Sequence, residues 1–192
     1  MLFNVKKEKE YMARKIQITQ DFIVNTAFQL ARKEGIENVT ARKLAAKAEC
    51  STQPIFRMYE NMDELYKDVF NMAVSFFSFY YERCEKNHSE PFVNLGYAYI
   101  RFAKEEKDLF RLLFLPNRSY GKSMYEILNG SKGIVVAEIE KARKDGCCNT
   151  GDLFTKMWIF VHGAACMAIT GDYDLDDEET IKLLVDTYKA FK

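Results

Sequence analysis

The chain has few residues that interrupt helices, and it has no long apolar run. Three prolines occur among its 192 residues, and proline removes a backbone N–H that the interior of a helix needs. Unbroken apolar runs reach only a few residues, whereas roughly 20 are needed to cross a bilayer. The N-terminus has neither the apolar segment nor the small-residue cleavage site of a signal peptide. These absences favour a helical, cytoplasmic protein without a membrane span.

Residue sets for catalysis, metal binding or a disulfide scaffold are also scarce. The five cysteines include no CxxC spacing and cannot all pair within one chain, which is typical of a reducing compartment. Two histidines occur, no Cys/His/carboxylate cluster has metal-ligand spacing, and no glycine-rich phosphate loop is present. We therefore expect no metal, no cofactor and no catalytic site, and we interpret the adjacent Cys147 and Cys148 as free thiols.

Charge is balanced over the whole chain but uneven along it. The formal net charge is zero. Residues 1–62 carry 11 Lys/Arg and 7 Asp/Glu, a net charge of +4, and residues 63–192 carry the compensating −4. A basic end and an acidic end fit a nucleic-acid-contacting head on a body that makes no such contact.

Apolar residues recur at helical spacing, and no strand-like alternation or internal repeat stands out. We predict an all-α fold of about nine helices. The first helix begins near Thr19 and ends before Gly35, and the longest runs from Asn61 to about Lys86. Helical spacing also marks the segments 92–104, 108–115, 119–144, 152–170 and 177–191.

The most specific pattern lies within residues 40–65. Two short helical patterns, 40–48 and 52–59, are separated by a turn of about three residues, which is the layout of a helix-turn-helix. Leu44, Cys50 and Ile55 are expected to form the core that holds these two helices together. Several polar or exposed side chains in the pattern have the chemistry to contact a base edge or a phosphate. They are Thr40, Arg42, Thr52, Gln53, Pro54 and Arg57.

A second motif lies near the C-terminus. Trp158 and His162 are four residues apart and share one helix face, and Gly163 permits the close approach of another helix. His162 is either a hydrogen-bonded core residue or a polar group in a ligand pocket. Most aromatic residues of the body must be core, but pockets between helices are also lined by aromatic side chains with a few polar groups. Our candidates for such a lining are Phe76, Tyr80, Tyr97, Phe102, Tyr125, Trp158 and His162.

These motifs resemble those of TetR-type transcriptional regulators. The segment 18–65 is similar to the DNA-binding domain of that family, notably in Val39-Thr-Ala-Arg-Lys-Leu-Ala and Ser51-Thr-Gln-Pro-Ile-Phe-Arg-Met-Tyr. The segment Trp158-Ile-Phe-Val-His-Gly is similar to the Trp-His-Gly signature of one subgroup of the family. The resemblance implies an N-terminal arm at 1–15, a helix-turn-helix domain at 16–62 and a helical effector-binding and dimerisation domain at 63–192.

The resemblance also implies roles for the head residues. It makes Arg42, Gln53 and Pro54 candidate base contacts. It places Thr40, Phe56 and Arg57 where phosphates or base edges are contacted in the family.

Three residues depart from the family pattern. Phe56 replaces a tyrosine whose hydroxyl donates to phosphate, and Met62 replaces a lysine that commonly meets the DNA backbone. Glu49 stands where a glycine usually turns the chain. Each change should weaken the attraction to phosphate or strain the turn.

In this family the last two helices pair across a two-fold axis as a four-helix bundle. The apolar stripes of the segments 152–170 and 177–191 therefore supply a candidate dimer interface, although these residues could equally pack within one protomer. The residues are Ile159, Gly163, Cys166, Met167, Ile181, Leu184, Val185 and Tyr188. A homodimer is favoured because a helix-turn-helix usually reads two half-sites about 34–36 Å apart.

The expected function is that of a dimeric repressor on a palindromic double-stranded operator. A small hydrophobic or aromatic effector bound in the C-terminal domain would release it. The alternative is a DNA-binding regulator without a small-molecule effector, controlled by a protein partner. An enzyme acting through His162 would have too few candidate catalytic groups.

Overall fold

The computed structural model describes residues 18–115, 120 and 122–192, and this part of the chain is helical without strands. It confirms the predicted all-α fold, with ten α-helices and one 3₁₀ turn in the described part. The helices are α2 (Gln20–Glu34), α3 (Ala41–Lys47), α4 (Gln53–Met58), α5 (Met62–Arg83), α6 (Val93–Glu105), α7 (Lys107–Phe114), α8 (Met124–Asn129), α9 (Ile134–Lys144), α10 (Thr150–Thr170) and α11 (Asp177–Phe191). The 3₁₀ turn is Ile36–Asn38. The expected arm at 1–15 lies outside the described residues.

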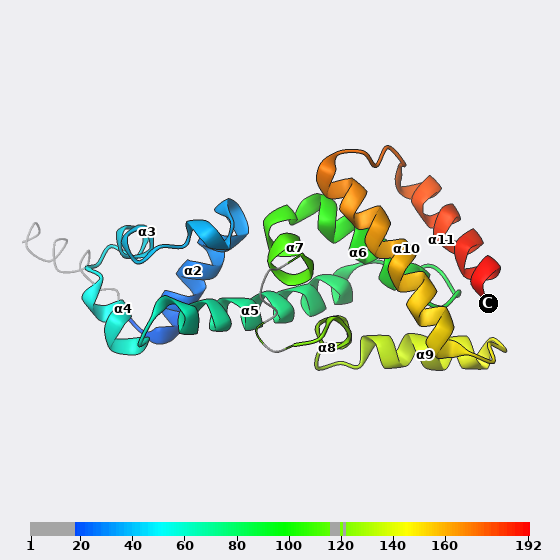
Figure 1. The fold of residues 1–192 in the computed structure, drawn as a ribbon, viewed down its shortest axis with the longest axis horizontal. Coiled ribbons are helices and arrows are strands. Elements are labelled where there is room, and N and C mark those ends of the chain that lie inside the picture. The colour runs from blue at the N-terminus through cyan, green and yellow to red at the C-terminus, as the bar shows by residue number, and fades with distance from the viewer. Residues whose placement is uncertain (1–17, 116–119, 121) are drawn as a thin grey trace, which may run out of the picture.

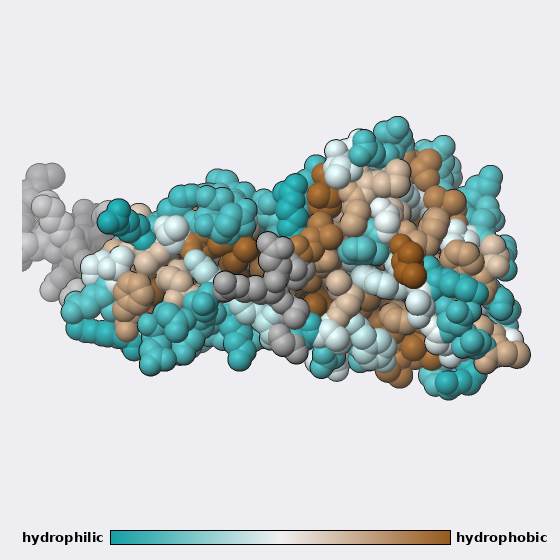
Figure 2. Space-filling view, in the orientation of Figure 1, coloured by the Kyte–Doolittle hydropathy of each residue, from teal (hydrophilic) through white to brown (hydrophobic). Residues whose placement is uncertain are grey.

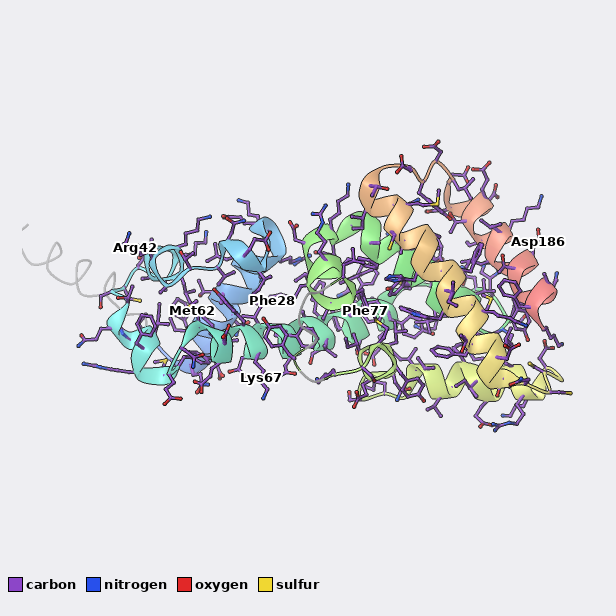
Figure 3. The ribbon with its side chains drawn as sticks, viewed as in Figure 1. Phe28, Arg42, Met62, Lys67, Phe77 and Asp186 are labelled. Carbon is purple, nitrogen blue, oxygen red and sulfur yellow. The ribbon has the colours of Figure 1, made fainter. Side chains whose placement is uncertain are left out.

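The molecule is elongated, with a small end and a large end joined by α5 (Figure 1). We call α2–α4 with the first turns of α5 the head, and α6–α11 with the rest of α5 the body. Helix α5 has 22 residues and is therefore about 33 Å long at 1.5 Å per residue. Asn61 caps it by accepting a hydrogen bond from the Glu64 N–H at 3.0 Å. Met62 marks its head end and Phe77 lies inside the body (Figure 3).

Local sequence accounts for the short helices of the head. Thr40 caps α3 by accepting from the Lys43 N–H at 3.2 Å, and Pro54 stands in the first turn of α4, where no intrahelical donor is lost. Ile23 of α2, Leu44 of α3 and Ile55 of α4 are completely buried against one another's helices. This confirms that Leu44 and Ile55 belong to the core of the helix-turn-helix.

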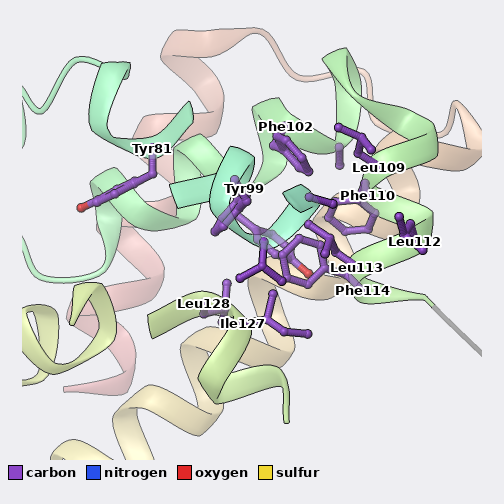
Figure 4. Packing of buried hydrophobic residues seen from close by; sticks show 14 of the residues in the cluster. Tyr81, Tyr99, Phe102, Leu109, Phe110, Leu112, Leu113, Phe114, Ile127 and Leu128 are labelled. Carbon is purple, nitrogen blue, oxygen red and sulfur yellow. The ribbon is translucent and has the colours of Figure 1, made fainter. Parts of the chain in front are cut away.

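The body is built around α6 and α10, which pack along each other. A cluster of aromatic side chains fills the space between them, α5 and α7 (Figure 4). Tyr99 is at its centre, with ring centroids at 5.0 Å from Phe110 and 4.7 Å from Phe114. Phe102 and Phe77 meet edge to face at 5.1 Å, which is a favourable arrangement for aromatic pairs.

The predicted helix at 119–144 is two helices in the structure, α8 and α9. Gly130 and Gly133 separate them with φ values of 53° and 67°, which L side chains rarely adopt. This break raises the helix number above the expected nine. The long helix from Asn61 also ends three residues earlier than expected, at Arg83.

Helix α10 is long and apolar enough to cross a membrane by length and composition alone. In the body it packs on α6 through Met157, Val161, Ala164 and Ala165, yet only 33% of its most apolar stretch is buried. An apolar helix with this much uncovered surface is typical of a helix that forms an interface with a partner.

Candidate nucleic-acid interface and body pocket

The structure gathers the polar side chains of the helix-turn-helix on the outside of the head. Arg42 lies on α3 at the end of the head that faces away from the body (Figure 3). Gln53 and Arg57 are exposed on α4, with Thr52 and Pro54 half-buried at its start. Thr40 is exposed at the start of α3, although its hydroxyl oxygen already serves as the helix cap.

The arginines of this surface are free to meet an anion. Within the described residues, neither Arg42 nor Arg57 has an ion-pair partner. Lys43, by contrast, points back to α2, where its ammonium group lies 3.1 Å from Glu34 Oε2 and 3.2 Å from Asn38 Oδ1. The guanidinium groups therefore offer bidentate donors to a base edge or a phosphate without breaking an internal contact.

The turn between α3 and α4 has a strained backbone at Glu49, as expected from the glycine that the family usually has there. Glu49 has a φ of 51°, in the left-handed region that favours glycine. The turn is nevertheless closed, because the Cys50 N–H donates to the Ala45 carbonyl at 3.0 Å. A non-glycine residue in this region costs on the order of 1 kcal/mol, and the head retains this turn while α3 and α4 both pack on α2.

The other two departures also have structural counterparts. Phe56 is 51% exposed on α4, so an apolar ring without a hydroxyl to donate lies on the outer surface of the head. Met62 is partly buried against the head core at the first position of α5, where it offers no charge to phosphate. Neither side chain carries a charge or a hydroxyl group that could attract a phosphate.

Two tyrosine hydroxyl groups form hydrogen bonds between α5 and the segments next to α3 and α4. The Tyr59 hydroxyl, just after α4, donates to Asp68 at 2.9 Å, and burial raises the pKa of Tyr59 to about 12. The Tyr66 hydroxyl donates to the Val39 carbonyl, just before α3, at 2.7 Å. The hydrogen bonds of α5 thus reach the segment before α3 and the segment after α4.

A second contact joins the head to the body directly. Arg32 of α2 donates from Nε to Glu106, the residue between α6 and α7, at 2.7 Å, and its Nη2 donates to the other carboxylate oxygen. This hydrogen bonding raises the pKa of Arg32. The guanidinium also lies 4.7 Å from the ring centroid of Phe76 on α5, and Phe28 of α2 packs on the same ring at 5.6 Å. We call these four residues the Arg32 clamp.

A pocket lies at the centre of the body, between α6, α8 and α10. Its walls are almost wholly apolar, and its free volume of about 20 Å³ has room for about one water molecule. The lining residues are Phe92, Leu95, Gly96, Tyr99, Leu128, Phe154, Met157, Trp158 and Val161.

Of the seven lining candidates taken from the sequence, Trp158 alone lines this pocket. Tyr125 packs on the lining residue Phe154 at 6.0 Å, and Phe102 lies behind the wall in the aromatic cluster. Three candidates do not face the pocket. Phe76 belongs to the Arg32 clamp, the Tyr80 hydroxyl donates to Glu105 at 2.8 Å, and burial together with the nearby Asp177 raises the pKa of Tyr97.

His162 stands beside the pocket and hydrogen-bonds one of its walls. Its Nδ1 lies 3.0 Å from the Tyr99 hydroxyl, and its Nε2 lies 3.6 Å from Cys166 Sγ. The imidazole stacks on Trp158 at 5.3 Å between ring centroids. Burial lowers the pKa of His162, because a low-dielectric surrounding disfavours the imidazolium. The contacts of His162 are thus those of a hydrogen-bonded core residue, the first of the two interpretations. Its position beside the pocket is also consistent with the second, a polar group in a ligand pocket.

The candidate dimer residues fall into two groups. Leu184 and Tyr188 are buried within the protomer itself, and Cys166 turns toward His162. Ile159 is 67% exposed and Met167 is 47% exposed on the outer surface of α10. Gly163 lies between them, with nothing near the place where a Cβ would stand, and Ile181 and Val185 of α11 are half-buried.

An open groove of about 610 Å³ follows this outer surface, with α10 on one side and α11 and the α10–α11 connection on the other. Figure 2 shows brown residues gathered over the body, whereas the visible face of the head is mostly teal. Exposed apolar surface that is this continuous is characteristic of an interaction face.

The three-helix head, the long connecting helix and the all-helical body together define a class of DNA-binding regulators. Residues 92–188, about half of the chain, match the family model of the tetracyclin repressor-like C-terminal domain. The chain therefore belongs to the TetR-like family of transcriptional regulators. No curated protein matches it.

A TetR-like transcriptional regulator from Rhodococcus sp. RHA1 has a similar solved structure. The comparison covers 88% of this chain and 92% of that one, with a TM-score of 0.56 and 14% sequence identity. At this identity the likeness shows the fold alone. The chain thus shares the head-and-body architecture over most of its length.

Proposed function

We propose that this TetR-like regulator is a cytoplasmic, dimeric repressor that binds a palindromic operator and is released by a small apolar effector. The observation that carries the proposal is the set of exposed polar side chains on the head, where Arg42 and Arg57 have no ion-pair partner among the residues that the structure describes. Arg42 and Arg57 suit guanine or phosphate, Gln53 suits adenine, and the ring of Pro54 suits a thymine methyl group.

The departures of the head from the family pattern determine the DNA affinity that we expect. Phe56 and Met62 leave fewer phosphate contacts than the family pattern supplies. Because sequence-independent affinity comes from phosphate neutralisation, we expect low non-specific affinity, and each missing phosphate contact should also make the fall of affinity with salt less steep. Specificity then rests mainly on Arg42, Gln53 and Arg57.

The outer surface of α10 supports dimerisation. Ile159 and Met167 expose apolar side chains around Gly163, and the adjacent groove offers room for side chains of a second copy. A two-fold pairing of this surface would present two heads to one DNA duplex, as reading of two half-sites requires. The revised interface is Ile159, Gly163 and Met167 with Ile181 and Val185.

A chain of aromatic contacts supports coupling between pocket and head. Trp158 packs on Tyr99 at 5.1 Å, Tyr99 on Phe77 at 6.1 Å, Phe77 on Phe102 at 5.1 Å and Phe102 on Phe76 at 6.3 Å. Phe76 is part of the Arg32 clamp, which contacts the head. An effector that opens the small pocket must shift these rings, and only about 1.4 kcal/mol of differential binding changes operator affinity tenfold.

The DNA proposal is tested by footprinting. The purified protein is titrated on the DNA upstream of its own gene at low salt, and a protected inverted repeat is expected. Absence of any protected site on that DNA, together with equal affinity for random duplexes, would contradict specific binding.

The small pocket volume favours the alternative of a regulator controlled by a protein partner, since about one water molecule fills the present space. A thermal-shift screen of apolar and aromatic metabolites separates the two proposals. Stabilisation of the wild type that is lost in Trp158→Ala supports the small effector. A screen without stabilisers, combined with a partner protein that alters operator affinity, supports the alternative.

A further inference from the structure

Three side chains where α6 meets α10 form a hydrogen-bonded row. Tyr99 of α6 is joined to His162 Nδ1 at 3.0 Å, and Cys166 Sγ lies 3.6 Å from His162 Nε2. The row therefore holds a thiol, an imidazole and a phenol in sequence. A nucleophile, a base and a group that orients the base stand in the same order in many nucleophilic sites.

The surroundings keep the imidazole neutral and ordered. Its ring is stacked with Trp158 of α10 at 5.3 Å and with Phe110 of α7 at 6.3 Å, and burial lowers its pKa. Tyr99 and Cys166 are the titratable groups that contact it. The two ring nitrogens exchange roles with the tautomer: with the proton on Nε2 the Tyr99 hydroxyl donates to Nδ1, and with the proton on Nδ1 the nitrogen Nε2 can accept the Cys166 S–H, which is the tautomer that a base requires.

Cys166 differs from the other cysteines near the C-terminus. It is half-buried, and burial raises the pKa of its thiol, so the sulfur is protonated at neutral pH. Such a thiol becomes a good nucleophile when a base takes its proton as the new bond forms. Cys147 is buried and Cys148 is exposed, and within the described residues neither has a histidine contact.

We propose that Cys166 is a site of covalent modification by apolar α,β-unsaturated carbonyl compounds, with His162 as its general base and Tyr99 as the positioning residue. The aromatic rings around the imidazole suit an electrophile of low polarity. The proposal does not depend on the small-effector proposal, because it requires only the row and partial access to Cys166.

The reaction balances without an oxidant. Sγ bonds to the β-carbon of the electrophile while its proton moves to His162 Nε2, and the electron pair of the C=C bond moves toward the carbonyl oxygen as an enolate. The α-carbon of that enolate then takes a proton from the imidazolium. The products are a thioether on Cys166 and a neutral His162.

The test uses N-ethylmaleimide, an α,β-unsaturated carbonyl probe, on the full-length protein. Peptide mass spectrometry gives a separate labelling rate for Cys166 and for the exposed Cys148 between pH 6.5 and 8. A thiol that reacts through its thiolate labels about tenfold faster per pH unit below its pKa. Because neutral His162 is the base, the rate of Cys166 is expected to change less than about twofold per pH unit over this range.

Two variants sharpen the result. His162→Phe keeps a stacked ring without a base, and it should lower the Cys166 rate at pH 7 at least about tenfold and restore the steep pH dependence, since general-base catalysis contributes about 10²–10⁴-fold. Tyr99→Phe should lower the rate less and keep the shallow profile. The Cys148 rate should be the same in all three proteins.

Three outcomes would overturn the proposal. They are an unlabelled Cys166, a wild-type Cys166 rate that rises tenfold per pH unit, and a rate that His162→Phe leaves unchanged. Circular dichroism checks the folding of each variant. If His162→Phe fails to fold, the pH profile of the wild type decides by itself.

Discussion

In the head, the side chains proposed to read DNA point outward, whereas in the body the aromatic side chains proposed to couple the pocket to the head point inward. Gln53 and Arg57 are exposed on α4, whereas Tyr99 is 1% exposed and Phe102 is fully buried. The proposed function of the head therefore depends on which groups its surface offers, and these exposed residues can be exchanged with little effect on folding. The body depends on how its residues pack, so there function and stability are not separable.

The two regions are joined by few contacts. Helix α5 carries Tyr59 and Tyr66 contacts at its head end and the aromatic cluster at its body end, and the Arg32 clamp adds the second connection. A signal between the two regions therefore passes through α5, through the Arg32 clamp or through the packing of α2 on α7. The following predictions test the contrast between the regions and the routes between them.

The largest effect is expected for the reading side chains of the head. The double variant Gln53→Ala/Arg57→Ala should weaken operator binding by about 2–6 kcal/mol, since each bidentate base contact contributes about 1–3 kcal/mol. Fluorescence anisotropy with the footprinted operator measures this loss. Arg83→Ala removes one exposed positive charge from α5 in the body and should leave affinity unchanged. Equal losses in both proteins would mean that net charge, not the head, determines binding.

The next effect concerns packing in the body. Phe102→Ala should destabilise the protein by about 3–5 kcal/mol, because a large buried side chain is removed from a close-packed cluster. Phe56→Ala removes the same side chain from a surface where it is 51% exposed, and about 0.5 kcal/mol or less is expected. Urea denaturation measures both. A similar loss at the two positions would contradict the outward–inward contrast.

The third prediction addresses the apolar outer surface of α10. Ile159→Glu/Met167→Glu should convert the dimer to monomers, because a closed apolar interface does not accept four unpaired carboxylates. The control is Phe79→Glu, which places a carboxylate on α5 at a 51% exposed side chain outside the proposed interface. It should leave the dimer intact. Light scattering coupled to size exclusion gives the masses. A dimer that survives the first substitution would place the interface elsewhere.

A smaller effect is expected at the Arg32 clamp. Arg32→Ala removes a half-exposed ion pair and a cation–π contact, which together contribute about 1–2 kcal/mol. Proteolysis of the head should become faster, and operator affinity should respond less to an effector than in the wild type. Arg101→Ala, which breaks another exposed Arg–Glu pair on α6, is the matched control. An unchanged effector response in Arg32→Ala would mean that coupling runs through α5 or through the packing of α2 on α7 instead.

The smallest effect is the pH dependence due to His162. Burial lowers its folded-state pKa below the unfolded value of about 6.5, so the unfolded chain takes up this proton more readily. The contribution of His162 to stability is present above that pH and is lost as pH falls through it. The wild type should lose stability between pH 7.5 and 5.5 more steeply than His162→Phe does. Parallel curves of unfolding free energy against pH would contradict this assignment.

Much of the head could be predicted from the sequence because its signals are local. Thr40 and Asn61 cap helices in the structure as their positions indicate, and Leu44 and Ile55 are buried as their spacing predicts. The left-handed Glu49 was also expected from its place in the turn. The roles of Arg42, Gln53 and Arg57 toward DNA remain predictions.

The pocket of the body could not be predicted in the same way. Helical spacing tells that Phe76, Tyr80 and Tyr97 are on apolar faces, but it does not tell which neighbouring helix each face meets. The missed lining residues have a partial signal, since Phe154 and Trp158 are four residues apart, and Met157 and Val161 share the adjacent stripe. Nothing in the sequence joined Tyr99 to His162, 63 residues away, because that contact exists only after α6 and α10 have packed.

The central claim is that the exposed side chains of α3 and α4 read a specific DNA sequence in two symmetric half-sites. Selection of bound duplexes from a random library at low salt tests this claim most directly. The wild-type protein should enrich an inverted repeat whose half-site centres are about 10 base pairs, or a multiple, apart. The Gln53→Ala/Arg57→Ala protein should enrich none. No enrichment by the wild type, or the same repeat enriched by both proteins, would contradict the claim.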